Sequence, residues 1–425
     1  MKSEQRLGVK MSHIGNNAGS WHGGTPCGTS FDNEPRHKGV LLAPLALPPK
    51  GVIMKNLRAT TVMLAASALV LAGCAAEDAS ESTATSGSTN TGTDTTETTQ
   101  ATTASVMDSV LAAGVVRCGT RDSLPGFAVL QDSGEHVGFD SDFCRAIAAA
   151  VFGDAGAVEM VDLETADRFT ALQNGAVDVL VRNTTWTATR DGSEAATFLQ
   201  PNFYDGQGMM VASGSGYDSV SDMNGAIVCV AKGTTTEGNA ALESSRLGLG
   251  WEIRSFDETD LILEAFIAGQ CDGWSSDVSQ LTGFRSAYPD GPNALKILPE
   301  VFSKEPLAPA VLDGDTKWAQ VVNWAILATI QAEEFGITSA NVDSIRSSTE
   351  DVSILRFLGA DVPTSDGAAV LDPGLGLPTD FAYQIVKQVG NYGEIFERHL
   401  APLGLERGVN ALWTDGGIMY APPYR

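Results

Sequence analysis

Apolar residues along the chain follow two kinds of pattern, and the two alternate from residue 114 onward. Residues 114–120 (GVVRCGT) form an apolar run with the length of a buried strand. Within residues 140–154, apolar residues recur every four positions and predict a helix: Phe143, Ile147 and Val151. We expect Asp140 or Ser141 to cap this helix and Gly153 to end it. Strand and helix patterns continue to alternate, which indicates an α/β fold.

A helix-to-strand unit occurs twice in the sequence. Residues 171–183 (ALQNGAVDVLVRN) and 265–277 (AFIAGQCDGWSSD) align without a gap. Each copy has a helix-ending glycine, an Asp that opens a strand and a polar residue five positions later: Gly175, Asp178 and Asn183 in the first, Gly269, Asp272 and Asp277 in the second. Chance similarity is the alternative. Two similar lobes would each present a polar residue at the carboxyl end of a strand, where open sheets bind ligands.

The remaining patterns complete a two-lobed organisation. Residues 316–335 predict a long helix that returns to the first lobe, with one apolar face: Trp318, Val322 and Ile326. The C-terminal region has a Gly/Pro-rich segment and one amphipathic helix from Phe381 to His399, and we expect it to pack outside the lobes. The predicted segments are the first lobe at 106–207, the second at 208–304, the return at 305–340 and the extension at 341–425.

The N-terminal part of the chain carries the signature of export. Residues 54–73 combine two basic residues with an apolar run, as a secretory signal peptide does. The run closes on LAGC, which resembles the lipobox of bacterial lipoproteins, so we expect Cys74 to be lipidated; a buried cysteine is the alternative. Because a signal peptide acts at a chain start, we expect translation to begin at Met54 and residues 1–53 to be a non-native leader. Residues 74–105 are rich in Ser and Thr and predict a flexible tether.

Composition narrows the possible partners. The 425 residues are 43% hydrophobic and 19% charged, with a formal net charge of -25. Such a chain can bury a large core, but nucleic-acid binding needs a surplus of Lys and Arg and is not expected. Only His136 and His399 follow the signal peptide, which argues against a His-based active site. We expect no cofactor, no metal and a monomer, with small solutes or proteins as partners.

Three short stretches at the predicted cleft have the chemistry to hold an amino acid. A carboxylate is best held by an Arg fork with hydroxyls or helix N-terminal amides, and an ammonium needs a carboxylate. Residues 182–190 (RNTTWTATR) supply hydroxyls and an Arg, and residues 275–277 (SSD) supply an acid. Residues 232–238 (KGTTTEG) form a Gly and hydroxyl loop that enters a predicted helix, without the Walker spacing.

These stretches resemble the polar amino-acid-binding proteins of ABC importers, most closely the general L-amino-acid-binding subgroup. The matching motifs include LPGF, RFTALQNGAVDVLVRNTTWT, YDGQG, GTTTE and the tail GVNALWTDGGIMYAPP. The resemblance covers residues 106–425. It implies a type II periplasmic-binding-protein fold, in which each of two α/β lobes is a mixed sheet flanked by helices. Two segments cross between the lobes, and the ligand lies in the cleft.

The resemblance also implies roles for individual residues. Carried onto matching positions, it gives polar ligand contacts to Asn183 and Thr185, the α-carboxylate to Arg190, caps on that carboxylate to Thr234 and Thr235, the ammonium to Asp277, and the side-chain pocket to Leu124, Phe127 and Trp186. The ordinary alternatives are a solvated Arg190, a turn-capping Asp277 and a core Trp186. YDGQG (204–208) lies where a hinge is expected, and a simple turn is its alternative.

Four cysteines follow the tether, and an exported protein can oxidise them. We favour Cys118 with Cys144, which would join the first strand to the first helix, and Cys229 with Cys271 in the second lobe. Two other connectivities stay open, and so do four free buried thiols.

The predicted function is that of an extracytoplasmic solute-binding lipoprotein, not an enzyme. It would capture L-amino acids and deliver them to an ABC permease in the membrane, with hinge closure as the transport signal. One alternative is a cyclohexadienyl or arogenate dehydratase-like enzyme on the same fold, which would need a further acid in the cleft. The other is a sensory amino-acid-binding domain, which would be expected to continue beyond Arg425 into a membrane span or signalling module.

Overall fold

The computed structural model describes residues 105–424. The predictions for the leader, the signal peptide, the lipidated Cys74 and the tether up to residue 104 lie outside the described residues. No helix between residues 105 and 424 combines the length and the apolar character that crossing a bilayer requires.

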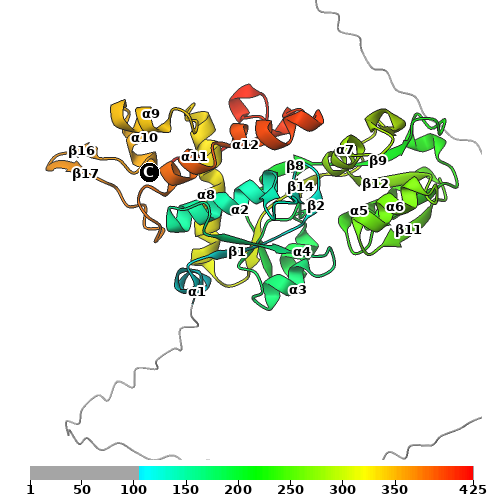
Figure 1. Ribbon diagram of the computed structural model, residues 1–425, viewed down its shortest axis with the longest axis horizontal. Coiled ribbons are helices and arrows are strands. Elements are labelled where there is room, and N and C mark those ends of the chain that lie inside the picture. The colour runs from blue at the N-terminus through cyan, green and yellow to red at the C-terminus, as the bar shows by residue number, and fades with distance from the viewer. Residues whose placement is uncertain (1–104, 425) are drawn as a thin grey trace, which may run out of the picture. The chain divides into compact units, whose positions relative to one another are not determined.

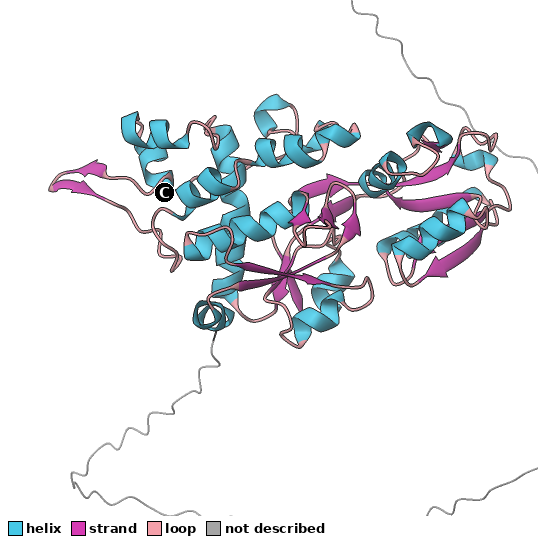
Figure 2. Cartoon of the chain, viewed as in Figure 1, coloured by secondary structure: helices cyan, strands magenta, loops and turns pink. Residues whose placement is uncertain are grey.

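The first lobe is built on a five-stranded mixed sheet with the order β5-β1-β6-β15-β7. Its strands are β1 (Val116–Thr120), β5 (Val158–Asp162), β6 (Val179–Leu180), β7 (Ala196–Phe198) and β15 (Ala310–Leu312). β1 runs parallel to β5 and β6, whereas β15 is antiparallel to β6 and β7. The helices of this part of the chain are α1 (Val106–Ala113), α2 (Phe139–Phe152), α3 (Arg168–Gln173), α4 (Ala188–Ser193) and α8 (Thr316–Glu334). Figure 2 shows this sheet with helices beside it.

The second lobe repeats this plan, with the strand order β11-β10-β12-β9-β13. Its strands are β9 (Gln207–Ala212), β10 (Ile227–Ala231), β11 (Glu252–Phe256), β12 (Gly273–Asp277) and β13 (Leu295–Ile297). The helices are α5 (Thr235–Leu247), α6 (Thr259–Ile267) and α7 (Val278–Ser286), with short 3-10 turns η1 (Val220–Asp222) and η2 (Pro292–Ala294). β10 is parallel to β11 and β12, and β9 is antiparallel to β12 and β13. The predicted fold of two mixed sheets flanked by helices is confirmed.

Two strands carry the chain between the sheets. β8 (Phe203–Asp205) leads directly into β9, and β14 (Glu305–Leu307) leads back toward β15. β8 and β14 pair antiparallel in a two-stranded sheet of their own. A small three-stranded sheet of β2 (Ser123–Leu124), β3 (Ala128–Leu130) and β4 (His136–Val137) lies between β1 and α2 in sequence.

The repeated unit has the same hydrogen bonds in both lobes. In the first, the Arg117 amide donates to the Asp178 carboxylate at 2.8 Å and the Asp178 amide donates to the Arg117 carbonyl at 2.8 Å. In the second, Ile227 and Asp272 exchange the same pair of bonds at 2.8 Å each. The glycine before each Asp is left-handed, as a helix end requires, with φ of 71° and 68°. The likeness predicted between the two segments is therefore structural.

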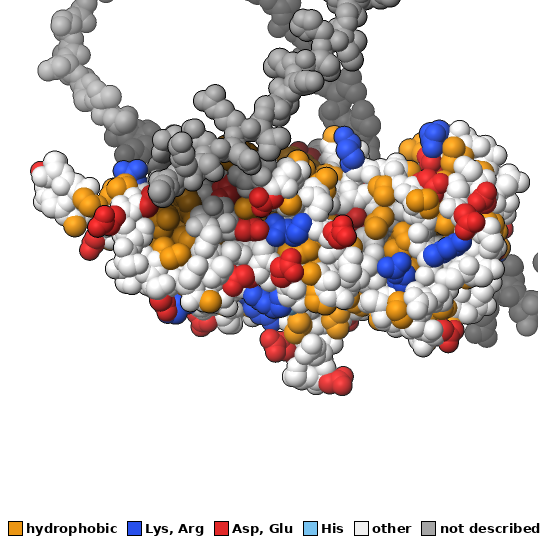
Figure 3. Space-filling model, turned by 90° about the horizontal axis from the view of Figure 1, so that it is seen from above, with side chains coloured by type: hydrophobic (Ala, Val, Ile, Leu, Met, Phe, Trp, Pro, Cys, Tyr) orange, Lys and Arg blue, Asp and Glu red, His pale blue; other side chains and the backbone are white. Residues whose placement is uncertain are grey.

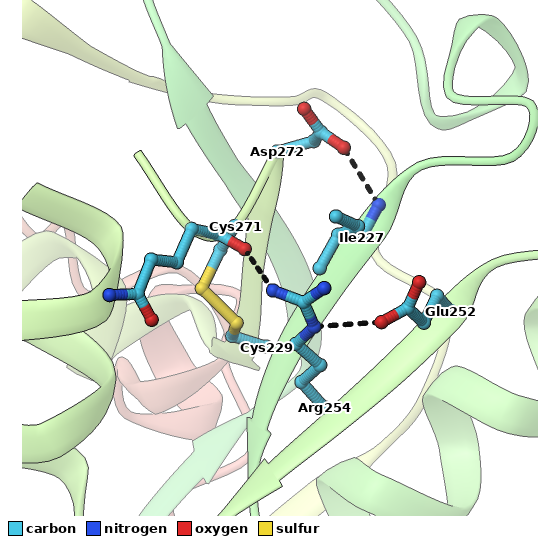
Figure 4. The surroundings of a disulfide bond; sticks show 7 residues. Ile227, Cys229, Glu252, Arg254, Cys271 and Asp272 are labelled. Carbon is cyan, nitrogen blue, oxygen red and sulfur yellow. Dashed lines mark hydrogen bonds and ion pairs between the residues drawn. A yellow bond between two sulfur atoms is a disulfide. The ribbon is translucent and has the colours of Figure 1, made fainter. Parts of the chain in front are cut away.

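A disulfide joins elements within each lobe. Cys118 of β1 is bonded to Cys144 of α2, with Cα atoms 5.9 Å apart, and Cys229 of β10 is bonded to Cys271, with Cα atoms 5.8 Å apart. These are the two pairs that the sequence favoured. Figure 4 shows the second disulfide beside the Asp272–Ile227 bond, with Arg254 bonded to Glu252 close by.

The C-terminal region contains short helices and one hairpin. They are α9 (Val342–Ser348), α10 (Val352–Phe357), β16 (Val362–Thr364), β17 (Gly367–Ala369), α11 (Phe381–Gln388), α12 (Tyr392–His399), η3 (Ala401–Leu403), η4 (Gly408–Asn410) and η5 (Trp413–Asp415). α11 and α12 pack against α2 and α8, as Figure 1 shows.

Two expectations about helix ends were wrong. The single helix predicted from Phe381 to His399 is split into α11 and α12 at Gly390, which has φ of 107°, and Asn391 starts α12 with a capping box to Glu394. The N-cap of α2 is Gly138, not Asp140 or Ser141. A Cβ at Gly138 would lie 2.1 Å from the Phe127 carbonyl oxygen, so only glycine fits there.

The C-terminal region also braces the strand that crosses between the lobes. The Asn410 side chain accepts a hydrogen bond from the Tyr204 amide at 2.7 Å and donates one to the Tyr204 carbonyl at 2.9 Å. Asn410 is only 3% exposed. Its amide group thus pairs with β8 as a neighbouring strand would.

Replacing Asn410 by Ala leaves both backbone groups of Tyr204 without a partner. We expect the free energy of unfolding to fall by about 2 kcal/mol, since unsatisfied buried groups cost about 1–3 kcal/mol. Urea unfolding followed by circular dichroism measures this. Asn293→Ala, at an exposed position, is the matched control and should change stability little. Equal effects of the two substitutions would show that Asn410 does not brace β8.

Candidate functional site

A polar cavity lies where the carboxyl ends of strands from the two sheets meet. Its volume is about 40 Å³, which is room for a few water molecules. It is lined by Arg121, Thr165, Arg168, Arg182, Asn183, Thr185 and Arg190 from the first lobe, and by Ala231, Thr234, Thr235, Thr236, Thr259, Ser276, Asp277 and Gln280 from the second. Of these residues, four are arginines and one is an acid.

Arg190 is held on the first-lobe side of the cavity. It lies in α4, whose N-cap Thr187 accepts a hydrogen bond from the Arg190 amide at 3.2 Å. One guanidinium nitrogen donates to the Thr185 carbonyl at 2.8 Å, and the guanidinium carbon lies 5.7 Å from the centre of the Phe169 ring. These contacts fix the plane of the fork and leave further N–H donors for a ligand. Burial lowers the pKa of Arg190, although the group stays cationic.

Asp277 lies on the second-lobe side, at the end of β12. Its carboxylate receives no hydrogen bond from any residue between 105 and 424, although the residue is only 5% exposed. Burial raises the pKa of Asp277 well above its ordinary value, and the nearby carboxylates of Asp205 and Glu305 raise it further. A cation in the cavity would relieve both effects by pairing with the carboxylate.

The N-terminus of α5 supplies backbone amides rather than hydroxyls. The Thr234 hydroxyl donates to the Ala231 carbonyl at 2.6 Å and also caps the helix, and the Thr235 hydroxyl donates to the Glu305 carboxylate at 2.9 Å. Since both hydroxyl protons are engaged, the free donors are the amides of the first helical turn. These amides, together with the positive end of the helix, suit a carboxylate.

Several side chains bond from one lobe to the other across the cavity. Arg121 donates to the Thr259 hydroxyl at 2.6 Å, and Asn183 donates to the Gln280 side-chain oxygen at 3.3 Å. Asn183 has φ of 35°, a conformation that Asn tolerates better than most residues. The two lobes are therefore in their closed arrangement.

The site pairs cationic and anionic groups around one small space, as binding of a zwitterion requires. Within residues 105–424, no cluster of His, Cys, Asp and Glu suited to a metal ion occurs. On the face drawn in Figure 3, basic side chains lie singly among acidic and apolar ones and form no continuous basic patch of the kind that binds nucleic acid.

Comparison with known proteins gives the family. Residues 116–339 match the sequence model of the bacterial extracellular solute-binding proteins, family 3. The chain belongs to this family. It is 45% identical over 324 residues to the general L-amino acid-binding periplasmic protein AapJ of Rhizobium johnstonii, covering 76% of this chain and 93% of that protein. It is 42% identical to the glutamate/glutamine/aspartate/asparagine-binding protein BztA of Rhodobacter capsulatus, with coverage of 76% and 94%.

A solved structure supports the same assignment. The chain is similar, with a TM-score of 0.72 and 44% identity, to an ABC transporter periplasmic binding protein from Brucella ovis with glutathione bound. The match covers 76% of this chain and all of that structure. This likeness covers a larger share of the chain than residues 116–339, which match the family model.

Most of the site residues predicted from the sequence come together in the family-3 cavity. Six of them line it: Asn183, Thr185, Arg190, Thr234, Thr235 and Asp277. The aromatic and aliphatic positions do not. Phe127 and Leu124 are fully buried, and Phe127 packs edge-on against Phe139 and Phe203. Trp186 is 38% exposed and stacks on Phe198. The expectation that these three shape the side-chain pocket is corrected, because packing within the first lobe turns them away from the cavity.

The site residues predicted from the sequence did not include three arginines and five polar residues of the cavity: Arg121, Arg168, Arg182, Thr165, Thr236, Thr259, Ser276 and Gln280. Arg121 follows β1 and Arg182 follows β6. Asn183 was predicted because polar residues at the carboxyl ends of strands can bind ligands, and the same rule applied to every strand would have found both arginines. Arg168, Thr165 and Gln280 lie on a loop or on helices, and their direction depends on how the lobes meet. No local pattern gives that information.

Glu258 makes the closed arrangement sensitive to pH. It lies in the second lobe and accepts hydrogen bonds from the amide and hydroxyl of Thr165, in the first lobe, at 3.3 and 3.4 Å. Burial and the neighbouring Glu164 carboxylate raise the pKa of Glu258 to about 7. The stability that this group contributes is complete below its ordinary pKa of 4.5 and is lost as the pH rises through about 7.

We therefore expect the free energy of unfolding of Glu258→Gln to rise relative to that of the unaltered protein between pH 5 and pH 8. The reason is that the amide stays neutral, whereas the Glu258 carboxyl group ionises. Urea unfolding at pH 5 and pH 8 measures the difference in free energy. Glu350→Gln, at an exposed position, is the control. A difference between Glu258→Gln and the unaltered protein that does not change with pH would contradict the assignment.

Proposed function

We propose that the protein captures L-amino acids outside the cytoplasm and delivers them to an ABC importer. The main support is that two opposite charges without an ion-pair partner in the described part of the chain, Arg190 and Asp277, lie on the two sides of one cavity. The Arg190 fork and the first-turn amides of α5 suit the α-carboxylate, and the Asp277 carboxylate suits the α-ammonium. The names of the relatives AapJ and BztA support this ligand class. Glutathione, present in the Brucella ovis structure, also has an α-amino-acid head.

Binding is coupled to lobe movement in this proposal. Hydrogen bonds cross from one lobe to the other at the cavity, from Arg121 to Thr259 and from Asn183 to Gln280, so the lobes must part before an amino acid can enter. β8 and β14 are the segments that bend, and Gly206 directly follows β8. A side chain does not fit at Gly206 without a shift of its neighbours, because a Cβ there would lie 2.3 Å from a Val301 methyl group and 2.9 Å from the Ser303 carbonyl oxygen. Closure then completes the two ionic contacts and presents the loaded form to the permease.

The protein binds its ligand without transforming it, acts as a monomer and is anchored by lipid on Cys74. Asp277 acts as a counter-ion for the ammonium rather than as a general acid. Incubation with prephenate, arogenate and mixed amino acids, followed by mass spectrometry, should reveal retained amino acids and no product. Turnover of either of the first two compounds would support the dehydratase alternative instead.

Metabolic labelling with a radioactive fatty acid tests the lipid anchor, and Cys74→Ser should abolish the label.

Replacing Arg190 by Ala removes the partner of the ligand carboxylate. We expect L-amino-acid binding to weaken by about 3–5 kcal/mol, or at least about a hundredfold in Kd, because a buried carboxylate loses its charge-assisted bonds. Isothermal titration calorimetry measures the change, with an L-amino acid that a screen of mixtures has shown to bind.

Arg246→Ala is the matched control, since the Arg246 side chain is 66% exposed and lies on α5 away from the cavity. It should leave the affinity unchanged. Unchanged affinity in Arg190→Ala as well, with both variants folded by circular dichroism, would remove Arg190 from the site.

A further inference from the structure

The cavity has more positive charge than one zwitterion can neutralise. An amino-acid head pairs with Arg190 and Asp277, which leaves Arg121, Arg168 and Arg182 in the cavity wall. All three are at least nine-tenths buried. None of them forms an ion pair with a carboxylate anywhere in residues 105–424, whereas exposed arginines such as Arg246 and Arg254 do. Buried cations are normally paired, so these three arginines lack the direct ion pair that burial of a charge usually requires.

Two of the three guanidinium groups meet at Thr165, and that of Arg121 lines the same cavity. Arg168 donates to the Thr165 carbonyl at 2.6 Å, and Arg182 donates to the Thr165 hydroxyl at 3.1 Å. Arg182 is fixed further by a bond of 2.8 Å to the Leu163 carbonyl. Arg121 reaches the same wall and is held at 2.6 Å by the Thr259 hydroxyl of the second lobe. Neutral oxygens orient the cations but do not neutralise them.

Two buried donor atoms of this group have no partner. The Nε atoms of Arg168 and Arg121 are both buried and make no hydrogen bond within the described residues. The charges also repel one another. Burial lowers the pKa of Arg168 well below its ordinary value, and Arg190, Arg182 and Arg121 lower it further. Burial and Arg121 lower the pKa of Arg182 to about 9.

The nearest acids do not fill this role. Glu164, Glu258 and Asp260 line a neighbouring pocket whose wall Arg121 and Arg182 also form, and the buried Asp140 accepts a hydrogen bond from the Asn183 amide at 2.8 Å. These carboxylates favour the charged forms of Arg121 and Arg182, but none of them forms an ion pair with either arginine or raises the pKa of Arg168. Glu258 is bonded to Thr165 and faces Glu164, and within residues 105–424 neither glutamate forms an ion pair with an arginine of the cavity.

We propose that Arg168, Arg182 and Arg121 form a second anion subsite, which takes a second carboxylate carried by the ligand. The preferred ligands are then α-amino acids with an additional carboxylate, either on a short side chain, as in glutamate, or at the end of a γ-linked peptide, as in glutathione. This inference rests on the proposed function, because it presupposes that the amino-acid head lies between Arg190 and Asp277. It adds a substrate class and three residues that determine specificity.

The test compares glutamate with glutamine, which has nearly the same shape and lacks the second charge. Calorimetry on the full exported chain should give at least about a tenfold tighter Kd for glutamate. In Arg168→Gln, glutamate affinity should fall at least about tenfold while glutamine affinity changes less than about threefold. A parallel titration with glutathione shows whether a more distant carboxylate reaches the subsite. If it does, the affinity for glutathione should also fall in Arg168→Gln.

The melting temperature separates this role from a structural one. Removing one of several mutually repelling cations should leave the melting temperature unchanged or raise it, whereas loss of a structural arginine would lower it and weaken both ligands alike. Arg246→Gln is the matched control. Glutamine bound as tightly as glutamate by the unaltered protein would overturn the subsite and leave amino-acid binding intact. No binding of glutamate, glutamine or glutathione would overturn the proposed function together with the subsite.

Discussion

The site depends on charges that each lobe buries without neutralising them. Arg190 is held by a carbonyl in the first lobe, and Asp277 receives no hydrogen bond in the second. Each group is costly to bury alone, and the described chain has no ion pair for either. A ligand with one negative and one positive end satisfies both at once, and only when the lobes meet. The same charges therefore provide the affinity and the reason for closure.

The two lobes can present these charges toward each other because they share one architecture. In each, a helix-ending glycine and a strand-opening Asp fix the start of a central strand, through Asp178 in one lobe and Asp272 in the other. Asn183, shortly after β6, and Asp277, at the end of β12, then lie at equivalent edges of the two sheets. A crossing of β8 and β14 turns these edges toward one cavity, and Asn410 from the C-terminal region braces the crossing.

The sequence predicted those parts of the structure that are encoded locally. Periodicity located α2 and α8, and the repeat located the strand ends that carry Asn183 and Asp277. The direction of side chains on loops was not encoded in this way. Trp186 adjoins Thr185 in sequence and Phe127 follows Arg121 by six residues, but both pack against other rings of the first lobe and neither lines the cavity. The charge surplus of Arg121, Arg168 and Arg182 became visible only when the lobes brought them together, because each alone resembles an ordinary arginine. The break at Gly390 was missed since the apolar stripe runs on through it.

The most direct measurement is a crystal structure of the protein with L-glutamate bound. The account predicts one α-carboxylate oxygen or both within hydrogen-bond distance of the Arg190 guanidinium, and the α-ammonium within hydrogen-bond distance of the Asp277 carboxylate, with the lobes closed. A ligand that lies elsewhere, or closed lobes in which the amino-acid head contacts only one of these two residues, would contradict it.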